Sequence, residues 1–319
     1  MSDLVLVTGG TGFIGNGLVR ELLRAGYGIR ILDDDSRGSS ARLDDIRDSI
    51  ELVRGDVRDR GAVRRAMTGA YAVAHLAFIN GTEFFYSKPD LVLEVAVKGI
   101  VNTLDAAIEA GVGHYYLVSS SEVYQLASRI PTDESVGMSI PDPVNPRYSY
   151  AGGKIISELM AINYGRKYFE RTVIVRPHNV YGPDMGQEHV IPAFAIRMRQ
   201  QMAKHPSGPV PFEIQGDGRQ TRAFVYIDDF VDGCARAFLH GDNLGIYHVG
   251  TQEEVMIATV AELVAKACDR RIELIAGAER AGGAARRCPD ISKVRALGYE
   301  PKVSLEEGVR RTVAWYLTH

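Results

Sequence analysis

The chain has 319 residues, of which 45% are hydrophobic and 24% charged, and its formal net charge is −3 at pH 7 with neutral histidines. This is the composition of an ordinary globular protein with room for one large or two modest domains. The small net charge gives no electrostatic case for nucleic acid or an anionic membrane as a partner, and no apolar run approaches the ~20 residues of a membrane span.

Cysteine usage favours a reducing compartment, and cysteine and histidine spacing predicts no metal site in the protein. The three cysteines, Cys234, Cys268 and Cys288, show neither the spacing of a disulfide framework nor that of a zinc site. The eight histidines lack paired-ligand spacing, so we expect no metal site. The first predicted strand begins within four residues of Met1, so we expect no signal peptide. Together these features predict a cytoplasmic protein.

The first predicted elements are an apolar strand at residues 4–7, a glycine-rich turn and an amphipathic helix. Glycines recur at every third position, at Gly9, Gly12 and Gly15. In a dinucleotide site the first glycine permits the turn, the second lets the backbone approach the pyrophosphate, and the third lets helix and strand pack closely. The helix then directs its amide N–H groups at the anion. We predict a dinucleotide site here rather than an ordinary glycine-rich loop.

The second predicted strand, residues 28–32, ends at an acidic residue that bears on the cofactor's identity. Asp33 lies where a carboxylate accepts hydrogen bonds from the adenosine ribose hydroxyls. A 2′-phosphate would lie against Asp33, and Asp34 and Asp35 add negative charge. NAD is therefore favoured over NADP, and Arg37 is the nearby cation that opposes this prediction.

Strands and helices continue to alternate, which predicts a doubly wound parallel sheet of the Rossmann type. After the third strand, Asp56 can bond to the adenine amino group, or Asp56 or Asp59 can cap the next helix. Further strands are expected at residues 72–77 and 115–119, with a helix at 92–110 between them. Since ligands of such sheets bind at the carboxyl ends of the strands, one crevice should be faced by residues 9–15, Asp33, Asp56, Ala77 and residues 119–122.

A serine-rich strand end and a tyrosine–lysine pair predict catalytic groups. Residues 119–124 read Ser-Ser-Ser-Glu-Val-Tyr, and Tyr150 and Lys154 lie one turn apart on a helix expected to run through residue 164. The lysine charge can lower the pKa of the phenol, and a serine hydroxyl can hold the reacting oxygen. Alone, such a pair is ordinary helix surface. Combined with the glycine turn, it predicts a base that deprotonates an alcohol while hydride leaves for a nicotinamide.

From about Arg176 the pattern becomes more broken by proline and glycine, and a basic helix is predicted at residues 197–205. We expect residues 1–175 to form an NAD-binding domain, with segments around 223–250 returning to it. Residues 176–319 should form mainly a smaller α/β cap that binds the substrate. Its loops supply Asn179, Arg222 and Arg287, which suit a second diphosphate. Surface ion pairs are the alternative for the arginines, and Arg286 fits that alternative best.

With these motifs in view, the chain resembles the extended short-chain dehydrogenase/reductases, specifically the NAD-dependent nucleotide-sugar epimerase/dehydratase family. The resemblance covers nearly the whole chain. It is carried by residues 8–15, Asp33, residues 55–56, 75–77 and 119–124, Tyr150 with Lys154, residues 176–183, Arg222 and residues 287–290.

The resemblance implies a role for each matching residue. Ser120 would hold the sugar hydroxyl, Tyr150 would be the base, and Lys154 would position the nicotinamide ribose and tune Tyr150. Implied cofactor contacts are Gly9, Gly12, Phe13, Ile14, Gly15, Asp33, Asp56, Val57, Leu76, Ala77, Lys88, Tyr150 and Lys154. Implied contacts to a UDP-, GDP-, dTDP- or CDP-linked sugar are Ser120, Ser121, Glu122, Asn179, Arg222, Arg287 and Asp290.

The chain departs from the family pattern at two positions. Ala96 stands where the family usually has an asparagine that helps to order the cofactor site. Gln125 replaces the usual glycine after Val-Tyr and puts a long polar side chain beside the sugar pocket. The stretch after residue 77 is also unusual: Phe78 and residues 83–86 would line the sugar pocket.

Glu122 bears most directly on the type of reaction. The family's 4-epimerases usually have a small residue here, whereas a glutamate resembles the 4,6-dehydratases and UDP-glucuronate decarboxylases. Once C4 is a ketone, the C5 proton or a C6 carboxylate becomes labile, and a second acid/base group can act there. Arg287 occupies a place where decarboxylases and epimerases both have an arginine. Ser121 replaces an aspartate of the dTDP-glucose dehydratases. Glu122 therefore favours a 4,6-dehydratase or decarboxylase, with a 4-epimerase as the alternative.

Two further alternatives come from other classes of protein. A carbonyl reductase of a non-nucleotide substrate would leave Asn179, Arg222 and Arg287 without a diphosphate. A non-catalytic NAD-sensing Rossmann protein would typically lack Tyr150 or Lys154. The helices around residues 92–110 and 150–164 also resemble those that form a four-helix dimer interface in the family, so we expect a homodimer.

Overall fold

The computed structural model describes residues 2–278 and 285–319. A central sheet of seven parallel strands has the order β11-β6-β5-β4-β1-β2-β3. In that order the strands are Gly245–Val249, Arg171–Pro177, His114–Val118, Ala72–His75, Leu4–Thr8, Gly28–Asp33 and Ile50–Arg54. The chain builds outward from β1 to β3 and then returns to β4 on the other side of β1. The strand order therefore reverses between β1 and β4, where sheets of this kind bind ligands.

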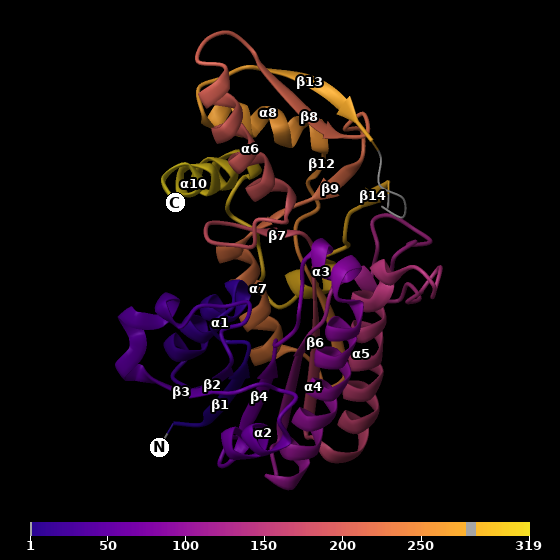
Figure 1. Ribbon diagram of the computed structural model, residues 1–319. Helices are drawn as coiled ribbons and strands as arrows, with labels where there is room; N and C mark the ends of the chain where they lie inside the picture. The colour runs from indigo at the N-terminus through magenta and orange to yellow at the C-terminus, as the bar shows by residue number, and fades with distance from the viewer. Residues whose placement is uncertain (1, 279–284) are drawn as a thin grey trace.

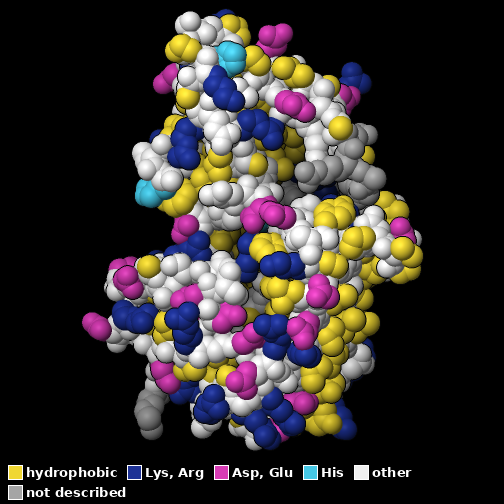
Figure 2. Space-filling view, viewed as in Figure 1, with side chains coloured by type: hydrophobic (Ala, Val, Ile, Leu, Met, Phe, Trp, Pro, Cys, Tyr) yellow, Lys and Arg dark blue, Asp and Glu magenta, His cyan; other side chains and the backbone are white. Residues whose placement is uncertain are grey.

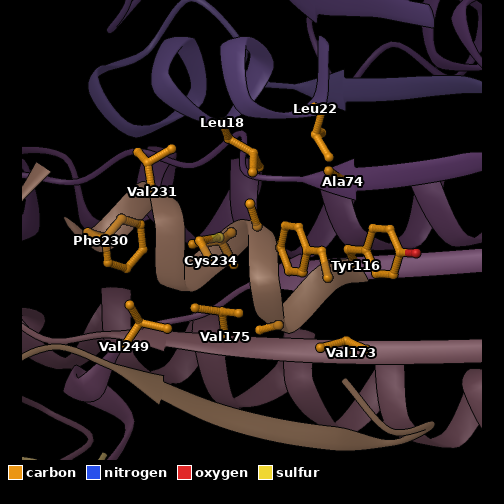
Figure 3. Packing of buried hydrophobic residues seen from close by; sticks show 14 of the residues in the cluster. Leu18, Leu22, Ala74, Tyr116, Val173, Val175, Phe230, Val231, Cys234 and Val249 are labelled. Atoms are coloured by element: carbon orange, nitrogen blue, oxygen red, sulfur yellow. The ribbon is translucent and has the colours of Figure 1, made fainter. Parts of the chain in front are cut away.

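Helices cover both faces of the sheet (Figure 1). Alternate residues of β1 point to opposite faces, so Val5 and Val7 join one core while Leu6 joins the other. In the first core, α1 (Phe13–Arg24) and α7 (Ile227–His240) pack Leu18, Leu22, Phe230 and Cys234 against Ala74, Tyr116, Val173 and Val175 (Figure 3). In the second, α2 (Arg60–Met67), α4 (Pro89–Glu109) and α5 (Ser149–Tyr168) cover the opposite face.

The rest of the chain forms a smaller α/β part with its own core, drawn at the top of Figure 1. It contains α6 (Val190–Lys204), α8 (Ile257–Ala267) and α10 (Leu305–Thr318), with a parallel pair formed by β8 (Val210–Gln215) and β13 (Ile272–Gly277). A small sheet has the order β12 (Glu254–Met256), β9 (Thr221–Ala223) and β14 (Arg286–Arg287). Another pairs β7 (Val180–Tyr181) with β10 (Val225–Tyr226). The predicted fold class is confirmed.

Short elements complete the connections between these parts. They are the 3₁₀ helices η1 (Ser40–Ser49), η2 (Ser121–Val123) and η3 (Pro146–Tyr148), and the helices α3 (Thr82–Ser87) and α9 (Ser292–Arg295). Among the described residues, no helix is long and apolar enough to cross a membrane.

The predicted bounds of three helices were wrong, and the helix expected at residues 92–110 is α4, Pro89–Glu109. The helix expected from residue 197 begins at Val190. Pro192 lies in its first turn, where a missing N–H breaks no helical hydrogen bond, so the proline does not prevent the helix from starting there. The helix expected to end at residue 164 continues to Tyr168, four residues further. The segment 227–249 crosses back from the smaller part, placing α7 against the large sheet and β11 at its edge.

Candidate active site

A cleft of about 610 Å³ lies at the carboxyl edge of the central sheet, facing the smaller part of the molecule. Figure 2 shows the surface hollowed between these two parts. The predicted site residues that line it are Gly9, Gly12, Phe13, Ile14, Gly15, Asp33, Asp56, Val57, Leu76, Ala77, Ser120, Ser121, Glu122, Tyr150, Lys154, Asn179 and Arg287. Residues from the glycine turn, five strand ends and the smaller part thus meet in one crevice.

The glycine turn has the shape that a pyrophosphate requires. Gly9 has a φ of 75°, in the left-handed region that glycine adopts without strain. A Cβ on Gly15 would lie 2.1 Å from the Gly9 carbonyl oxygen, so the third glycine allows the helix to pack on the turn. Gly12 is the N-cap of α1 and has no side chain to cover the first amide groups of that helix. These free N–H groups fit a dinucleotide's phosphates.

Asp33 and Arg37 lie at the adenosine end that the sequence predicts. The Asp33 carboxylate accepts hydrogen bonds from the backbone N–H of Thr11 and of Asp35, each at 3.0 Å, which fixes its orientation toward the cleft. Arg37 also lines the cleft, but its guanidinium is held by other groups. It donates to the Asn80 carbonyl at 2.9 Å, pairs with Glu188 and packs over the Phe84 ring. The cation that opposed NAD thus has other partners.

Asp56 and Asp59 take different roles. Asp59 caps α2, accepting from the N–H groups of Gly61 and Ala62. Asp56 lines the cleft and is paired with Arg58, whose hydrogen bond lowers the pKa of Asp56. Of the two sequence interpretations, the helix cap belongs to Asp59, and Asp56 lies at the cleft with both carboxylate oxygens bonded to Arg58.

Tyr150 lies buried between two phenyl rings at the start of α5. Phe85 stacks on its ring at 4.9 Å and Phe78 meets it edge-on at 5.2 Å. Burial raises the pKa of Tyr150 well above its ordinary value, although a hydrogen bond from the Ser120 side chain lowers it. At neutral pH the phenol therefore holds its proton, and Ser120 lies beside it as predicted.

Lys154 is 3% exposed and points back toward the end of β5. Its Nζ donates to the Val118 carbonyl at 2.7 Å and lies 3.8 Å from the centre of the Phe78 ring. Burial lowers the pKa of Lys154 to about 7, against the opposing charge of Glu158. Burial thus makes the Lys154 ammonium easier to deprotonate than that of an ordinary lysine.

A buried ionic network lies beneath these two residues and was not predicted. Glu158 follows Lys154 by one turn and has no exposed surface. It accepts two hydrogen bonds from Arg176, at 2.9 and 2.6 Å, and one from Ser119. Because both charges are paired and hydrogen-bonded, their burial is tolerated. The network fixes β5, β6 and α5 at the point where their ends meet the cleft.

Glu122 is the carboxylate nearest the predicted catalytic serine in sequence, and it bonds across the cleft. It lies in η2, where its N–H donates to Ser120 Oγ at 3.1 Å. Its Oε1 accepts from Arg287 of β14, and its Oε2 accepts from Gln125 at 3.1 Å. Burial acts to raise the pKa of Glu122, but the charge and hydrogen bond of Arg287 outweigh it and bring the pKa down to about 2.

Three predicted site residues lie outside the lining of the cleft. Lys88 is exposed at the start of α4. Asp290 accepts from the backbone N–H of Ser292. Arg222 is the register partner of Arg287 between β9 and β14, so it lies one strand away from a lining residue.

The departure at position 96 has a packing reason. Ala96 is fully buried, and a Cβ on Gly153 would lie 2.7 Å from the Ala96 Cβ. Helices α4 and α5 therefore cross closely here on two very small residues.

Sequence reasoning missed the loop that covers the cleft from the smaller part, residues 185–189. Two ion pairs hold this region to the large sheet's loops: Arg37 with Glu188, and Arg42 with Asp184. Arg42 also donates to the Thr11 carbonyl at 3.0 Å, next to the glycine turn. No local sequence motif indicates such pairs, because each joins residues more than 140 positions apart.

Comparison with known proteins agrees with this geometry. The sequence model of the NAD dependent epimerase/dehydratase family matches residues 5–250. The chain is 31% identical over 315 residues to UDP-glucuronic acid decarboxylase 1 of Arabidopsis thaliana, covering 97% of this chain and 69% of that protein.

Two solved structures are similar over almost their whole length. One is UDP-glucose 4-epimerase of Thermotoga maritima with UDP-glucose, at 28% identity, a TM-score of 0.85 and 99% coverage of both chains. The other is a double mutant of DesIV, a dTDP-glucose 4,6-dehydratase of Streptomyces venezuelae solved with NAD, at 31% identity and a TM-score of 0.84, covering 98% of this chain and 96% of that one. The similar proteins thus include a decarboxylase, an epimerase and a dehydratase, so similarity alone does not choose among these reactions.

Proposed function

This chain belongs to the NAD-dependent epimerase/dehydratase family, and we propose that it oxidises the C4 hydroxyl of a nucleotide-diphosphate sugar and then acts at C5 or C6. NAD is the cofactor of the family, and the glycine turn and Asp33 fit it. The observation that supports the second part is Glu122, a carboxylate in the same cleft as Tyr150 and Ser120.

The first step needs a base at the C4 hydroxyl, and bound NAD supplies the hydride acceptor. Tyr150 is the proposed base, with Ser120 holding the sugar oxygen. Because burial favours the neutral phenol, Tyr150 must first release its proton to solvent through the cleft, and the phenolate then takes the proton of the C4 hydroxyl as the hydride leaves. The charged form of Lys154, one turn away, favours that phenolate, and the rings of Phe78 and Phe85 pack against the Tyr150 ring.

The second step follows from the ketone. A carbonyl at C4 acidifies the C5 proton and activates a C6 carboxylate toward loss. Glu122 is the proposed acid/base group for this step, giving a 4,6-dehydratase or decarboxylase. Its pKa of about 2 means that it enters the reaction as a carboxylate, hence as a base or an electrostatic partner.

The substrate's phosphates need cations at the end of the cleft away from the glycine turn. Arg287 lines the cleft and Arg222 lies beside it on the next strand. Asn179 lines the cleft at a φ of 43°, held by a 2.8 Å hydrogen bond to the Ala223 carbonyl. We assign these residues to the nucleotide sugar. Residues 176–319, apart from the segment around 223–250, are proposed as the substrate-binding unit.

We also propose a homodimer formed through α4 and α5. Leu93 of α4 and Ile156 and Leu159 of α5 are exposed apolar side chains. Figure 2 shows hydrophobic side chains along the region where Figure 1 draws these two helices. A cytoplasmic location is proposed as well, supported by the free thiols of Cys234, Cys268 and Cys288.

The proposal is tested by incubating the purified protein with UDP-, GDP-, dTDP- and CDP-linked sugars and analysing the products by mass spectrometry. Turnover of at least one is expected. Tightly held NAD without turnover of any nucleotide sugar would contradict it. Glu122→Gln should still let substrate reduce bound NAD but should block elimination or decarboxylation. Full turnover by this variant would mean that Glu122 only lines the pocket.

A further inference from the structure

Gln125 stands at an unusual point of the backbone. Its φ is 46°, in the left-handed region where a side chain other than glycine or asparagine is strained. The family pattern has glycine here, which would adopt this conformation freely. Gln125 is also 7% exposed, so its long polar side chain is buried. Such a residue needs a compensating interaction.

The interaction is with Glu122. Gln125 Nε2 donates to the Glu122 backbone carbonyl at 2.7 Å and to the Glu122 Oε2 at 3.1 Å. The first bond closes the short helix η2 that carries Glu122, and the second holds the carboxylate itself. With Arg287 on Oε1, both carboxylate oxygens have a donor. Gln125 does not line the cleft, so it contacts Glu122 from behind.

We propose that Gln125 is a positioning residue that holds the Glu122 carboxylate for the step at C5 or C6. This inference rests on the proposed function of Glu122. The two donors differ in charge, and that difference gives them different roles. An anionic substrate group competes for the Arg287 guanidinium but not for a neutral amide. When Arg287 turns to the substrate, Gln125 remains on Oε2 and keeps Glu122 directed into the cleft.

Two variants separate the hydrogen bond from the backbone strain. Gln125→Met keeps a long side chain and the strained φ but has no donor, whereas Gln125→Gly relieves the strain and also has no donor. If the hydrogen bond from Gln125 holds Glu122 in place, both variants should slow the second step of the reaction. If only packing matters, Gln125→Met should behave like the wild type.

The first readout is a single turnover followed by NADH absorbance and by product mass. Both variants should reduce bound NAD at close to the wild-type rate and then complete the second step roughly tenfold or more slowly, so that NADH accumulates. In the plot of second-step rate against pH, the fall in rate on the acidic side should also move to higher pH, since the loss of a hydrogen-bond donor raises the pKa of a carboxylate. Wild-type rates and a wild-type pH dependence in both variants would overturn the inference.

The second readout does not depend on turnover. The free energy of unfolding is compared at pH 6 and pH 3 by urea denaturation. It should fall less between these pH values in Gln125→Met than in the wild type, because Glu122 is then held less strongly in its ionised form. Equal falls would contradict the inference. If the wild type turns over no nucleotide sugar, the proposed function fails, while this comparison still decides whether Gln125 holds Glu122.

Discussion

Two ionisable side chains in the cleft, Lys154 and Glu122, owe their charge states to different causes. Lys154 Nζ donates to a carbonyl and lies over an aromatic ring, and burial outweighs the charge of Glu158 and lowers the pKa of Lys154 to about 7. Glu122 is half-buried, and there Arg287 supplies a charge and a hydrogen bond that outweigh the effect of burial. A mechanism at this site therefore starts with an ionised Glu122 and a Lys154 that is easily deprotonated.

The ion pair of Glu122 predicts a pH dependence of stability. The pKa of Glu122 is about 2 in the folded protein, below its ordinary value of 4.5, so its stabilising contribution is present above pH 4.5 and is lost as the pH falls toward 2. A shift of this size corresponds to at most about 3 kcal/mol. Urea denaturation at pH 6 and pH 3 should show a smaller loss of stability in Glu122→Gln than in the wild type. Parallel losses would show that Arg287 does not hold the carboxylate.

At the scale of single elements, the glycine turn between β1 and α1 is the most tightly determined part of the site. Gly15→Ala places a methyl group 2.1 Å from the Gly9 carbonyl oxygen, so the turn or the helix must move. We expect a loss of about 1–3 kcal/mol of stability and weaker retention of NAD.

Thermal unfolding and the NAD content of the purified protein measure these effects. Gly137→Ala is the matched control, because a Cβ there meets nothing within 4 Å. If Gly15→Ala retains NAD and stability like this control, the turn does not pack as described.

Elements with a strong local pattern could be predicted from the sequence. The glycine spacing, Asp33 at a strand end and the Tyr150–Lys154 pair each satisfy a chemical demand within a few residues, and the structure brings all of them to the cleft. The short strands β7, β10 and β14 have only two residues each, too few to show an alternating pattern.

Contacts between distant residues left no local signal. The Glu122–Arg287 pair joins positions 165 residues apart, and no local feature of the sequence indicates that Gln125 bonds to Glu122. The Glu158–Arg176 pair is buried, where charged residues are rarely found. These contacts depend on the folded sheet, so periodicity and motif spacing could not reveal them.

At the scale of the whole molecule, the exposed apolar face of α4 and α5 predicts the oligomeric state. Leu159 is 49% exposed in the single chain, and burying it against a second copy would remove that apolar surface from water. Leu159→Asp should shift the protein from dimer toward monomer in sedimentation velocity.

Ile275→Asp serves as the control for this shift. Ile275 is 45% exposed but lies on β13, in the smaller part of the molecule. A monomeric wild type, or equal dissociation by both variants, would contradict a dimer built on α4 and α5.

The central claim is that chemistry continues beyond C4, and turnover in deuterated water tests it most directly. Removal of the C5 proton or loss of a C6 carboxylate leaves a carbon that takes its next proton from solvent. The product should therefore carry deuterium at C5 and lack the mass of water or carbon dioxide. An isomer of unchanged mass without deuterium would identify a simple 4-epimerase and contradict the role given to Glu122.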